Sequence, residues 1–387
     1  MDKSIWHEEG KAQFQVGKAF YNPESKLVRD LGVLAATIYQ QDHGSLRVLD
    51  ALSGCGVRSL RYWLESHANY LWINEGNPEL NSLLQQNLEI AMLPVRAKPI
   101  ASQAYQITHQ DAHRVFFDCY SRRDYYDLVD VDCFGTAVPY LSTMLWATKI
   151  GGLIYLTSTD GKTLTGHLPE NSIQAYGAIA RSHPAAHEQA LRLLIGSTQQ
   201  QAAAKGLGIE PIFSLFTGQT YRLMMRLVAK PRLTDKNYGF LAYCHGCGNY
   251  QTVTWRKLNK ISCACNDPAL TVSGAMWLGK LHHRQQLERF KILAQQLEWQ
   301  EVTELLSLMA AEIDFPPYFY TLREIGSRGK LDLPKRSHLI QALQDQGYQA
   351  TATHINPQAI KTNVDLDTCI AIAKDLGQVK GCLKNQK

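Results

Sequence analysis

Two side chains at the end of one predicted strand could do chemistry on an amino group. The segment Tyr126–Asp132 is expected to be a strand, and it continues into Cys133, Phe134 and Gly135. The carboxylate of Asp132 can accept a hydrogen bond from an amine and stabilise the positive charge that develops when the nitrogen is alkylated. Phe134 can stack on a planar base and hold it. The pair predicts group transfer to an exocyclic amine, with the alternative that Asp132 caps the next helix and Phe134 packs in the core.

Three further carboxylates lie at the ends of earlier predicted strands. Asp50 ends the first strand, before a turn that contains Gly54, while Glu75 and Asp111 follow the second and third strands. In an open α/β sheet, ligands bind beyond the carboxyl ends of the strands, where a carboxylate can accept hydrogen bonds from ribose hydroxyls. Each acid taken alone is more often a helix cap. Three in succession predict a nucleoside ligand, and the absence of a Walker lysine motif argues against ATP.

The strand-end residues named above can lie side by side only if the strands run parallel, with a helix between each strand and the next. Amphipathic segments such as Val57–Glu65 and Glu79–Ala91 lie between the predicted strands, which indicates a parallel, doubly wound α/β sheet. The last two strands are separated only by Gly218 and Gln219 and are expected to form an antiparallel hairpin, an outline typical of class I methyltransferases. The predicted strands are Arg47–Ala51, Leu71–Asn74, Ala104–Thr108, Tyr126–Asp132, Gly152–Ser158, Glu210–Thr217 and Thr220–Val228.

Positive charge is concentrated in the C-terminal part of the chain. Residues 1–229 hold 20 Lys and Arg against 21 Asp and Glu, a net charge of −1, whereas residues 230–387 hold 20 against 14, a net charge of +6. A basic region attached to a neutral one suits an enzyme that grips a polyanion, although unpaired surface lysines would give the same sum. Candidate contacts are Arg256, Lys257, Lys260, Arg328, Lys330, Lys335 and Arg336.

Four of the nine cysteines form two closely spaced pairs. Cys244 and Cys247 are separated from Cys263 and Cys265 by fifteen residues, a spacing at which four thiolates can close a tetrahedron around zinc. The second pair is one residue shorter than the usual Cys-x-x-Cys, so His245 or Asp267 could replace one ligand. We expect a structural Zn²⁺ site, since nothing nearby indicates an open coordination position.

Together these motifs resemble the tRNA guanosine-26 N2-dimethyltransferase family, and the similarity covers nearly the whole chain in one order. Further matches are Phe20-Tyr21-Asn22-Pro23, Arg29-Asp30-Leu31, Asp50 through Ser59, Thr157-Ser158-Thr159-Asp160, His187-Glu188, Leu191-Arg192, Tyr221-Arg222, Trp277-Leu278-Gly279, Thr353-His354 and Ile360-Lys361-Thr362. Three positions depart from the usual family pattern. Cys133 stands where proline is usual, Val28 where asparagine is usual, and Glu75 where aspartate is common.

The resemblance implies a role for each site residue and a function for the chain. Asp132 would be the catalytic carboxylate, and Phe20 and Phe134 would hold a guanine flipped out of the RNA. One or two methyl groups would pass from S-adenosyl-L-methionine to the exocyclic N2 of guanosine 26 of tRNA. The residues that would contact S-adenosyl-L-methionine are Arg29, Arg58, Glu75, Asp111 and Ala112, beside Asp50 and Gly54 from the pattern above.

We therefore expect a class I, Rossmann-like methyltransferase domain over residues 1–229. A C-terminal α+β domain that binds tRNA would follow over residues 230–387, with a zinc-ribbon-like element of four cysteines at 240–280. The alternatives are an amino-methyltransferase acting on rRNA guanine or DNA adenine, and an RNA-binding zinc-ribbon protein whose methyltransferase fold is inactive. The first residues carry no signal sequence and no apolar stretch could span a bilayer, so we expect a cytoplasmic protein, monomeric by default, with no membrane partner.

Overall fold

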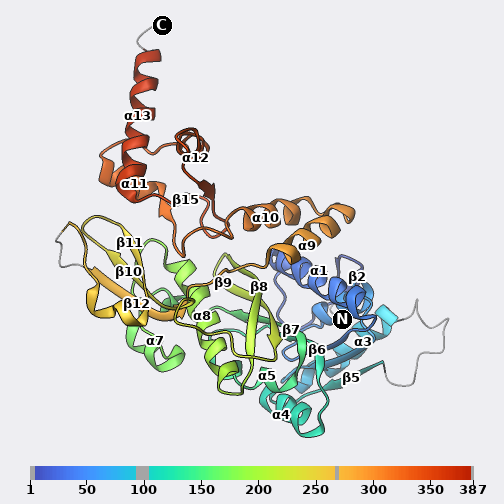
Figure 1. Cartoon of the computed structure of the whole chain (residues 1–387). Coiled ribbons are helices and arrows are strands. Elements are labelled where there is room, and N and C mark those ends of the chain that lie inside the picture. Colours follow the sequence, from blue (N-terminus) through green and yellow to red (C-terminus); the bar gives the residue numbers. More distant parts are fainter. Residues whose placement is uncertain (1–4, 93–103, 266–269, 385–387) are drawn as a thin grey trace.

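A seven-stranded sheet forms the centre of the molecule. The computed structural model describes residues 5–92, 104–265 and 270–384 (Figure 1). The strand order is β5-β4-β3-β6-β7-β9-β8, and β9 runs antiparallel to both of its neighbours while the other strands are parallel. The predicted mostly parallel sheet with its closing hairpin is confirmed. The bounds are β3 Arg47–Asp50, β4 Tyr70–Asn74, β5 Tyr105–Thr108, β6 Tyr126–Val131, β7 Thr148–Ser158, β8 Gly208–Thr217 and β9 Thr220–Val228.

Helices cover both faces of this sheet because its strands alternate buried side chains between two cores. On β3, Val48 belongs to one buried cluster and Leu49 to the other. The Val48 cluster contains residues of α1 Lys26–His43, α2 Val57–Leu64 and α3 Asn81–Met92. The Leu49 cluster contains residues of α4 Ala112–Arg122, α5 Met144–Ala147 and α8 Ala186–Ala203. A hairpin, β1 Trp6–Glu9 and β2 Ala12–Gln15, and the 3-10 turn η1 Pro23–Ser25 precede α1.

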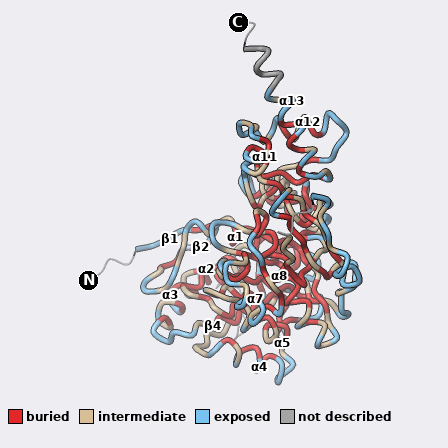
Figure 2. The backbone as a smooth tube through the Cα atoms, turned by 90° about the vertical axis from the view of Figure 1, so that its left-hand side faces the viewer, coloured by how far each residue is buried: buried red, intermediate tan, exposed pale blue. Residues whose placement is uncertain are grey.

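A second, three-stranded sheet packs against α8 and carries the paired cysteines. Its order is β11-β10-β12, and we call it the knuckle sheet: β10 Tyr238–Cys244, β11 Tyr250–Val253 and β12 Leu270–Trp277. Fourteen of the 18 residues of α8 are buried, because the helix contacts both β8 and β12 (Figure 2). Two short helices, α6 Gly161–Leu164 and α7 Pro169–Tyr176, lead from the end of β7 to α8.

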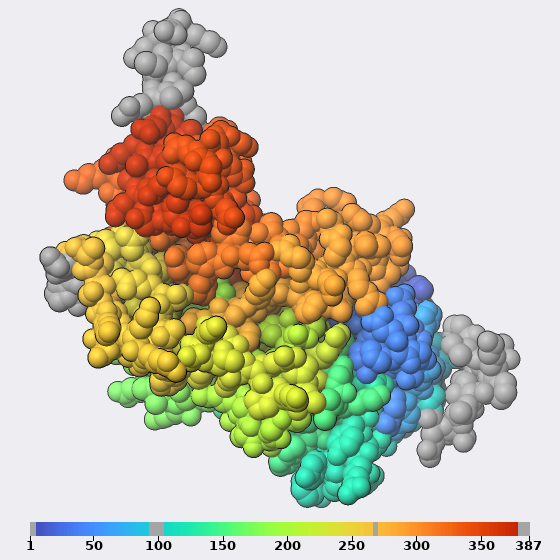
Figure 3. Space-filling view, viewed as in Figure 1, coloured from blue at the N-terminus to red at the C-terminus, as the bar shows by residue number. Residues whose placement is uncertain are grey.

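A third small sheet and its helices form a unit that projects from the rest of the surface (Figure 3). We call it the C-terminal unit. Its strand order is β13-β15-β14. The antiparallel helices α9 Arg284–Gln296 and α10 Gln300–Ala311 precede it and pack against α1. The bounds are β13 Tyr320–Thr321, α11 Leu322–Gly329, α12 Arg336–Asp345, β14 Ala350–Ala352, β15 Ala359–Thr362 and α13 Leu366–Lys384.

Buried charges join the C-terminal unit to helix α8, which packs on the central sheet. Glu188 on α8 accepts from Arg192 at 2.8 Å and from the Nζ of Lys361 on β15 at 2.7 Å. All three side chains are at most 4% exposed. The predicted boundary between residues 229 and 230 falls between β9 and β10, yet buried residues on both sides of it belong to one core cluster.

Candidate functional site

Asp132 lies directly beyond β6, at the carboxyl edge of the sheet, between two arginines. Arg58 on α2 donates to Oδ2 at 2.9 Å, and Arg222 on β9 donates to Oδ1 at 3.0 Å. The side chain of Asp132 remains 29% exposed while both guanidinium groups are 5% exposed. Burial favours the neutral acid, but the charges of Arg222 and Arg58 outweigh it and hold the pKa of Asp132 well below its usual range. The carboxylate is therefore fixed, anionic and open to solvent.

Below Asp132, a buried network supports Arg58. The second carboxylate, Asp130, accepts from Arg58 Nη1 at 3.1 Å and from the Tyr62 hydroxyl at 2.6 Å. Asp50 lies in the same network, fully buried, and accepts from Ser59 Oγ at 2.7 Å. Burial and the neighbouring charge of Asp130 raise the pKa of Asp50 to about 7. Asp50 thus lies beneath the turn that begins α2, rather than on the surface where a ligand could reach it.

Two aromatic side chains, one just after Asp132 and one in the segment beside Gly54, are almost fully exposed. Phe134 is 94% exposed and Phe20 is 82% exposed, although large apolar side chains are usually buried. The alternative in which Phe134 packs in the core is therefore wrong. The backbone of Phe20 lies beside Gly54, since a Cβ on that glycine would meet the Phe20 carbonyl oxygen at 3.4 Å.

The turn that carries Phe134 is tied to the end of β7. The Gly135 N–H donates to Thr159 Oγ1 at 2.7 Å, and the Thr159 N–H donates back to the Gly135 carbonyl at 2.8 Å. Cys133, where the related family usually has proline, is buried and donates from its thiol to the Thr157 carbonyl at 2.9 Å. Burial raises the pKa of Cys133 to about 12, so the residue fills the turn and is no thiolate nucleophile.

The predicted cofactor residues fall into two groups. Gly54 and Glu75 meet beyond the carboxyl ends of β3 and β4. There the Glu75 carboxylate accepts hydrogen bonds from the N–H groups of Gly54 at 2.8 Å and Asn77 at 3.0 Å. Asp111 accepts from the N–H of His113 at 2.8 Å, so the helix-cap alternative describes what it does here. Ala112 begins the same helix. These four residues line the carboxyl ends of β3, β4 and β5.

Arg29 and Arg58 are occupied by carboxylates. Arg29 is 5% exposed, forms an ion pair with Glu9 of the N-terminal hairpin and donates to the Asn22 carbonyl at 3.0 Å. These bonds hold the segment before α1, which carries Phe20. Arg222, which sequence reasoning noted only as part of a motif, is the missed residue, because its contact with Asp132 spans ninety positions.

The four paired cysteines converge. The Sγ atoms of Cys244 and Cys265 are 3.4 Å apart, as are those of Cys247 and Cys263, and all four lie within 4.8 Å of one another. Four thiols at such distances suit a tetrahedral Zn²⁺ site closed to further ligands. His245 is not part of this group, since its Nε2 faces Thr271 Oγ1 at 3.3 Å, and Asp267 lies outside the described residues.

One expected RNA contact instead supports the cysteines. Arg328 on α11 donates to the carbonyl oxygens of His245 at 3.0 Å and Gly246 at 2.6 Å. The guanidinium therefore ties the C-terminal unit to the turn between the first two cysteines, and its predicted contact with RNA stays a prediction. In the part of the chain that the structure describes, no helix is long and apolar enough to cross a membrane.

Comparisons with known proteins point in one direction. Residues 3–374 match the family described as N2,N2-dimethylguanosine tRNA methyltransferase. A tRNA (guanine(26)-N(2))-dimethyltransferase of Pyrococcus horikoshii is 29% identical over 95% of this chain and 97% of its own length. The tRNA (guanine(26)-N(2))-dimethyltransferase of Saccharolobus solfataricus is 28% identical over 97% of this chain and 96% of its own length. A solved structure of Trm1 from Pyrococcus horikoshii with S-adenosyl-L-methionine superposes with a TM-score of 0.82, at 28% identity, over 95% of this chain and 99% of that one.

Proposed function

The chain belongs to the N2,N2-dimethylguanosine tRNA methyltransferase family, and on that premise we propose how its own residues methylate guanosine 26 of tRNA at N2. S-adenosyl-L-methionine would supply the methyl group from its sulfonium, with cleavage of the methyl carbon–sulfur bond and S-adenosylhomocysteine as the leaving thioether. The observation that carries the proposal is the anionic Asp132 held by Arg58 and Arg222 beside the exposed Phe134. An rRNA or DNA substrate is not favoured, because the relatives named above act on tRNA.

Asp132 acts by accepting a hydrogen bond from the guanine amino group. The bond orients the nitrogen lone pair toward the methyl carbon and stabilises the positive charge that grows on N2 as the new bond forms. Because the arginines keep its pKa low, Asp132 is a weak base and does not retain the proton. The methylated nitrogen then loses its extra proton to water, and a second cycle needs the base to turn its remaining N–H toward Asp132.

Phe20 and Phe134 hold the base. A guanosine inside a tRNA stem must leave its stack to reach Asp132, which costs a few kcal/mol. Stacking on an aromatic ring contributes about 1–3 kcal/mol per base, so exposed rings at the mouth offset that cost. Their exposure in the free enzyme is what this role requires.

The cofactor would lie along the turn that Glu75 and Gly54 fix. Gly54 has φ +56, a left-handed conformation that favours glycine and lets the backbone approach a ligand closely. Glu75 and Asp111 would meet the ribose and adenine. Arg29 and Arg58 would act mainly by holding the walls of the site, since their guanidinium groups already bind Glu9 and Asp132.

We assign a structural Zn²⁺ to Cys244, Cys247, Cys263 and Cys265. The donor set is all thiol. Cys244 and Cys247 lie at the short loop between β10 and β11, and Cys263 and Cys265 lie in the longer connection between β11 and β12, after the 3-10 turn η5 Trp255–Lys260. Bound zinc would fix those loops and, through Arg328, the adjoining C-terminal unit.

The test is incubation of the purified enzyme with S-adenosyl-L-methionine and an unmodified tRNA transcript, followed by nucleoside mass spectrometry. We expect N2-methylguanosine and N2,N2-dimethylguanosine, and a transcript with adenosine at position 26 should yield neither. Methylation of an rRNA fragment or of DNA adenine, with the tRNA left unmodified, would refute the assignment.

A further inference from the structure

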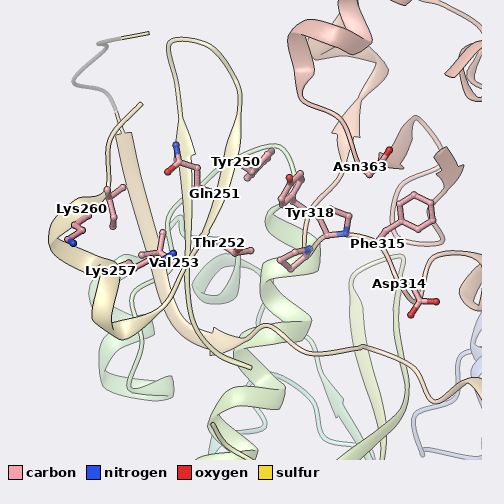
Figure 4. A pocket seen from close by; sticks show the side chains of 13 residues that line it. Tyr250, Gln251, Thr252, Val253, Lys257, Lys260, Asp314, Phe315, Tyr318 and Asn363 are labelled. Atoms are coloured by element: carbon pink, nitrogen blue, oxygen red, sulfur yellow. The ribbon is translucent and has the colours of Figure 1, made fainter. Parts of the chain in front are cut away.

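A basic, aromatic groove lies between the knuckle sheet and the C-terminal unit, and the proposed reaction does not use it. Its volume is about 740 Å³. Figure 4 shows Lys257 and Lys260 on one side, β11 along the middle, and Phe315 and Tyr318 on the other side. Pro316, Pro317 and Asn363 complete the second wall. The groove therefore joins two parts of the chain that are far apart in sequence.

The charge of this groove is positive. Lys257 and Lys260 lie on the 3-10 turn η5 Trp255–Lys260, are exposed, and make no ion pair with any residue that the structure describes. Asp314 is the one carboxylate among the lining residues. Its charge is already offset by Lys280 at 2.6 Å and by an ion pair with Arg284. Unpaired ammonium groups of this kind suit an anion with several phosphates.

The inner surface of the groove is built for a planar ligand. The rings of Tyr250 and Tyr318 are stacked, with centroids 4.6 Å apart and planes 13° from parallel. Tyr250 is buried, while Tyr318 is half-buried and lines the groove. Tyr318 also meets Tyr320 edge to face, with centroids 5.7 Å apart. A base placed against the part of Tyr318 that lines the groove would extend this aromatic cluster, and aromatic rings accept bases regardless of their identity.

We propose that this groove binds an unpaired nucleotide segment of the tRNA, with phosphates on Lys257 and Lys260 and a base against Tyr318. The inference rests on the proposed function, which supplies the tRNA. A duplex keeps its bases stacked inside, so it could contact the lysines but could not place a base in a concave, aromatic hollow. The ligand is thus a single-stranded part of a folded RNA, held at a second site besides the catalytic one.

Binding of an unmodified tRNA transcript against salt tests the charged wall. Lys257→Gln together with Lys260→Gln should lower the slope of log affinity against log salt by about 2, roughly one for each lost phosphate contact. The matched control is Lys11→Gln with Lys374→Gln, which removes two exposed lysines, between β1 and β2 and on α13, that make no ion pair with a described residue. Equal slopes for the two double variants would overturn the proposal.

The aromatic wall is tested with two RNAs. Tyr318→Leu should weaken tRNA binding by roughly 5- to 100-fold and leave binding of a fully paired RNA duplex unchanged. Thr252→Glu, at an exposed groove position, places a negative charge there without removing the ring, and should also weaken tRNA binding if Tyr318→Leu fails to fold. Equal losses for tRNA and duplex would show a general phosphate surface and refute the unpaired-nucleotide site.

The outcome separates this inference from the proposed function. If both proposals hold, the groove variants bind S-adenosyl-L-methionine normally and still methylate tRNA at saturating concentration, with a raised KM for tRNA. If the groove proposal alone fails, the wild-type enzyme still forms N2-methylguanosine and the variants keep its KM. If the proposed function fails, no N2-methylguanosine forms although tRNA binds.

Discussion

Asp132 carries its charge between two guanidinium groups, and this environment determines what substitutions there should do. Asp132→Asn keeps the shape and an acceptor oxygen but loses the negative charge opposite the developing ammonium. We expect kcat to fall by about 10²–10⁴ with the affinity for S-adenosyl-L-methionine unchanged. Calorimetry and single-turnover rates measure the two quantities. Asp124→Asn, in a half-exposed ion pair with Arg47, is the control, and wild-type turnover of Asp132→Asn would remove the carboxylate from the mechanism.

Arg222 should control the pH range in which Asp132 works. A cation beside a carboxylate lowers its pKa, so Arg222→Met should raise the pKa of Asp132. As the pH falls, Asp132 of the variant then becomes protonated at a higher pH than Asp132 of the wild-type enzyme. The wild-type enzyme should show no acid loss of kcat from Asp132 down to about pH 5, whereas the variant's acid limb should move upward. Arg226→Met, four residues along the same strand, should leave the profile in place, and superimposable profiles for all three proteins would contradict the clamp.

At the scale of elements, the turn between β3 and α2 depends on Glu75. Its two oxygens bind the N–H groups of Gly54 and Asn77, so Glu75→Ala removes both the predicted ribose contact and the bond that shapes the turn. We expect roughly 5- to 100-fold weaker S-adenosyl-L-methionine binding by calorimetry, with tRNA affinity unchanged. Glu79→Ala, an exposed residue of the 3-10 turn η2 Pro78–Leu80 that follows Glu75, is the control. Unaltered cofactor affinity would exclude Glu75 from the site.

The four cysteines of the knuckle sheet should hold zinc in the purified protein. We expect about one zinc per chain in protein never exposed to chelator, by elemental analysis. Cys263→Ser should lower that content, while Ser262→Ala in the same loop should retain it. A content below about a tenth of an equivalent in the wild-type protein would count against the four-cysteine site.

The elements were largely readable from the sequence, and the contacts between them were not. Alternation of apolar strands with amphipathic helices predicts the central sheet, and the Gly218-Gln219 pair predicts its hairpin. The N-terminal hairpin β1–β2 escaped prediction, because each strand has only four residues and β1, with the sequence WHEE, shows no alternation of apolar and polar residues. The placement of Asp50 beneath its turn depends on tertiary packing, which local pattern does not encode.

The site residues follow the same division. Asp132 and Phe134 were found because one strand end places them together, and the free exposure of Phe134 fits the predicted stacking role. Arg222 and the tether formed by Arg328 were not found, because each joins segments about eighty or ninety residues apart. Those roles required the fold, although both side chains are visible in the sequence.

At the scale of the whole molecule, the buried ion pair between Lys361 and Glu188 should be a large contributor to stability. Lys361→Met leaves part of the Glu188 charge uncompensated in the core, and breaking a buried pair in this way typically costs about 3–5 kcal/mol. Urea unfolding should show that Lys361→Met lowers the free energy of unfolding by that amount. Lys374→Met, at an exposed position on α13, should leave the free energy of unfolding nearly unchanged. Glu188→Gln combined with Lys361→Met should cost less than the sum of the two single changes. If the loss of unfolding free energy in the double variant equals the sum of the two single losses, the two residues act independently.

The same ion pair restricts how the gene can be recombined. A chimera that takes its C-terminal unit from one relative and its central sheet from another inherits a lysine without its glutamate, or the reverse, unless both parents carry the pair. Glu188 lies on α8 and Lys361 on β15, so a crossover anywhere between them takes the two residues of the ion pair from different parents. Viable exchanges should therefore retain both residues, and functional screens of shuffled libraries would show them inherited together.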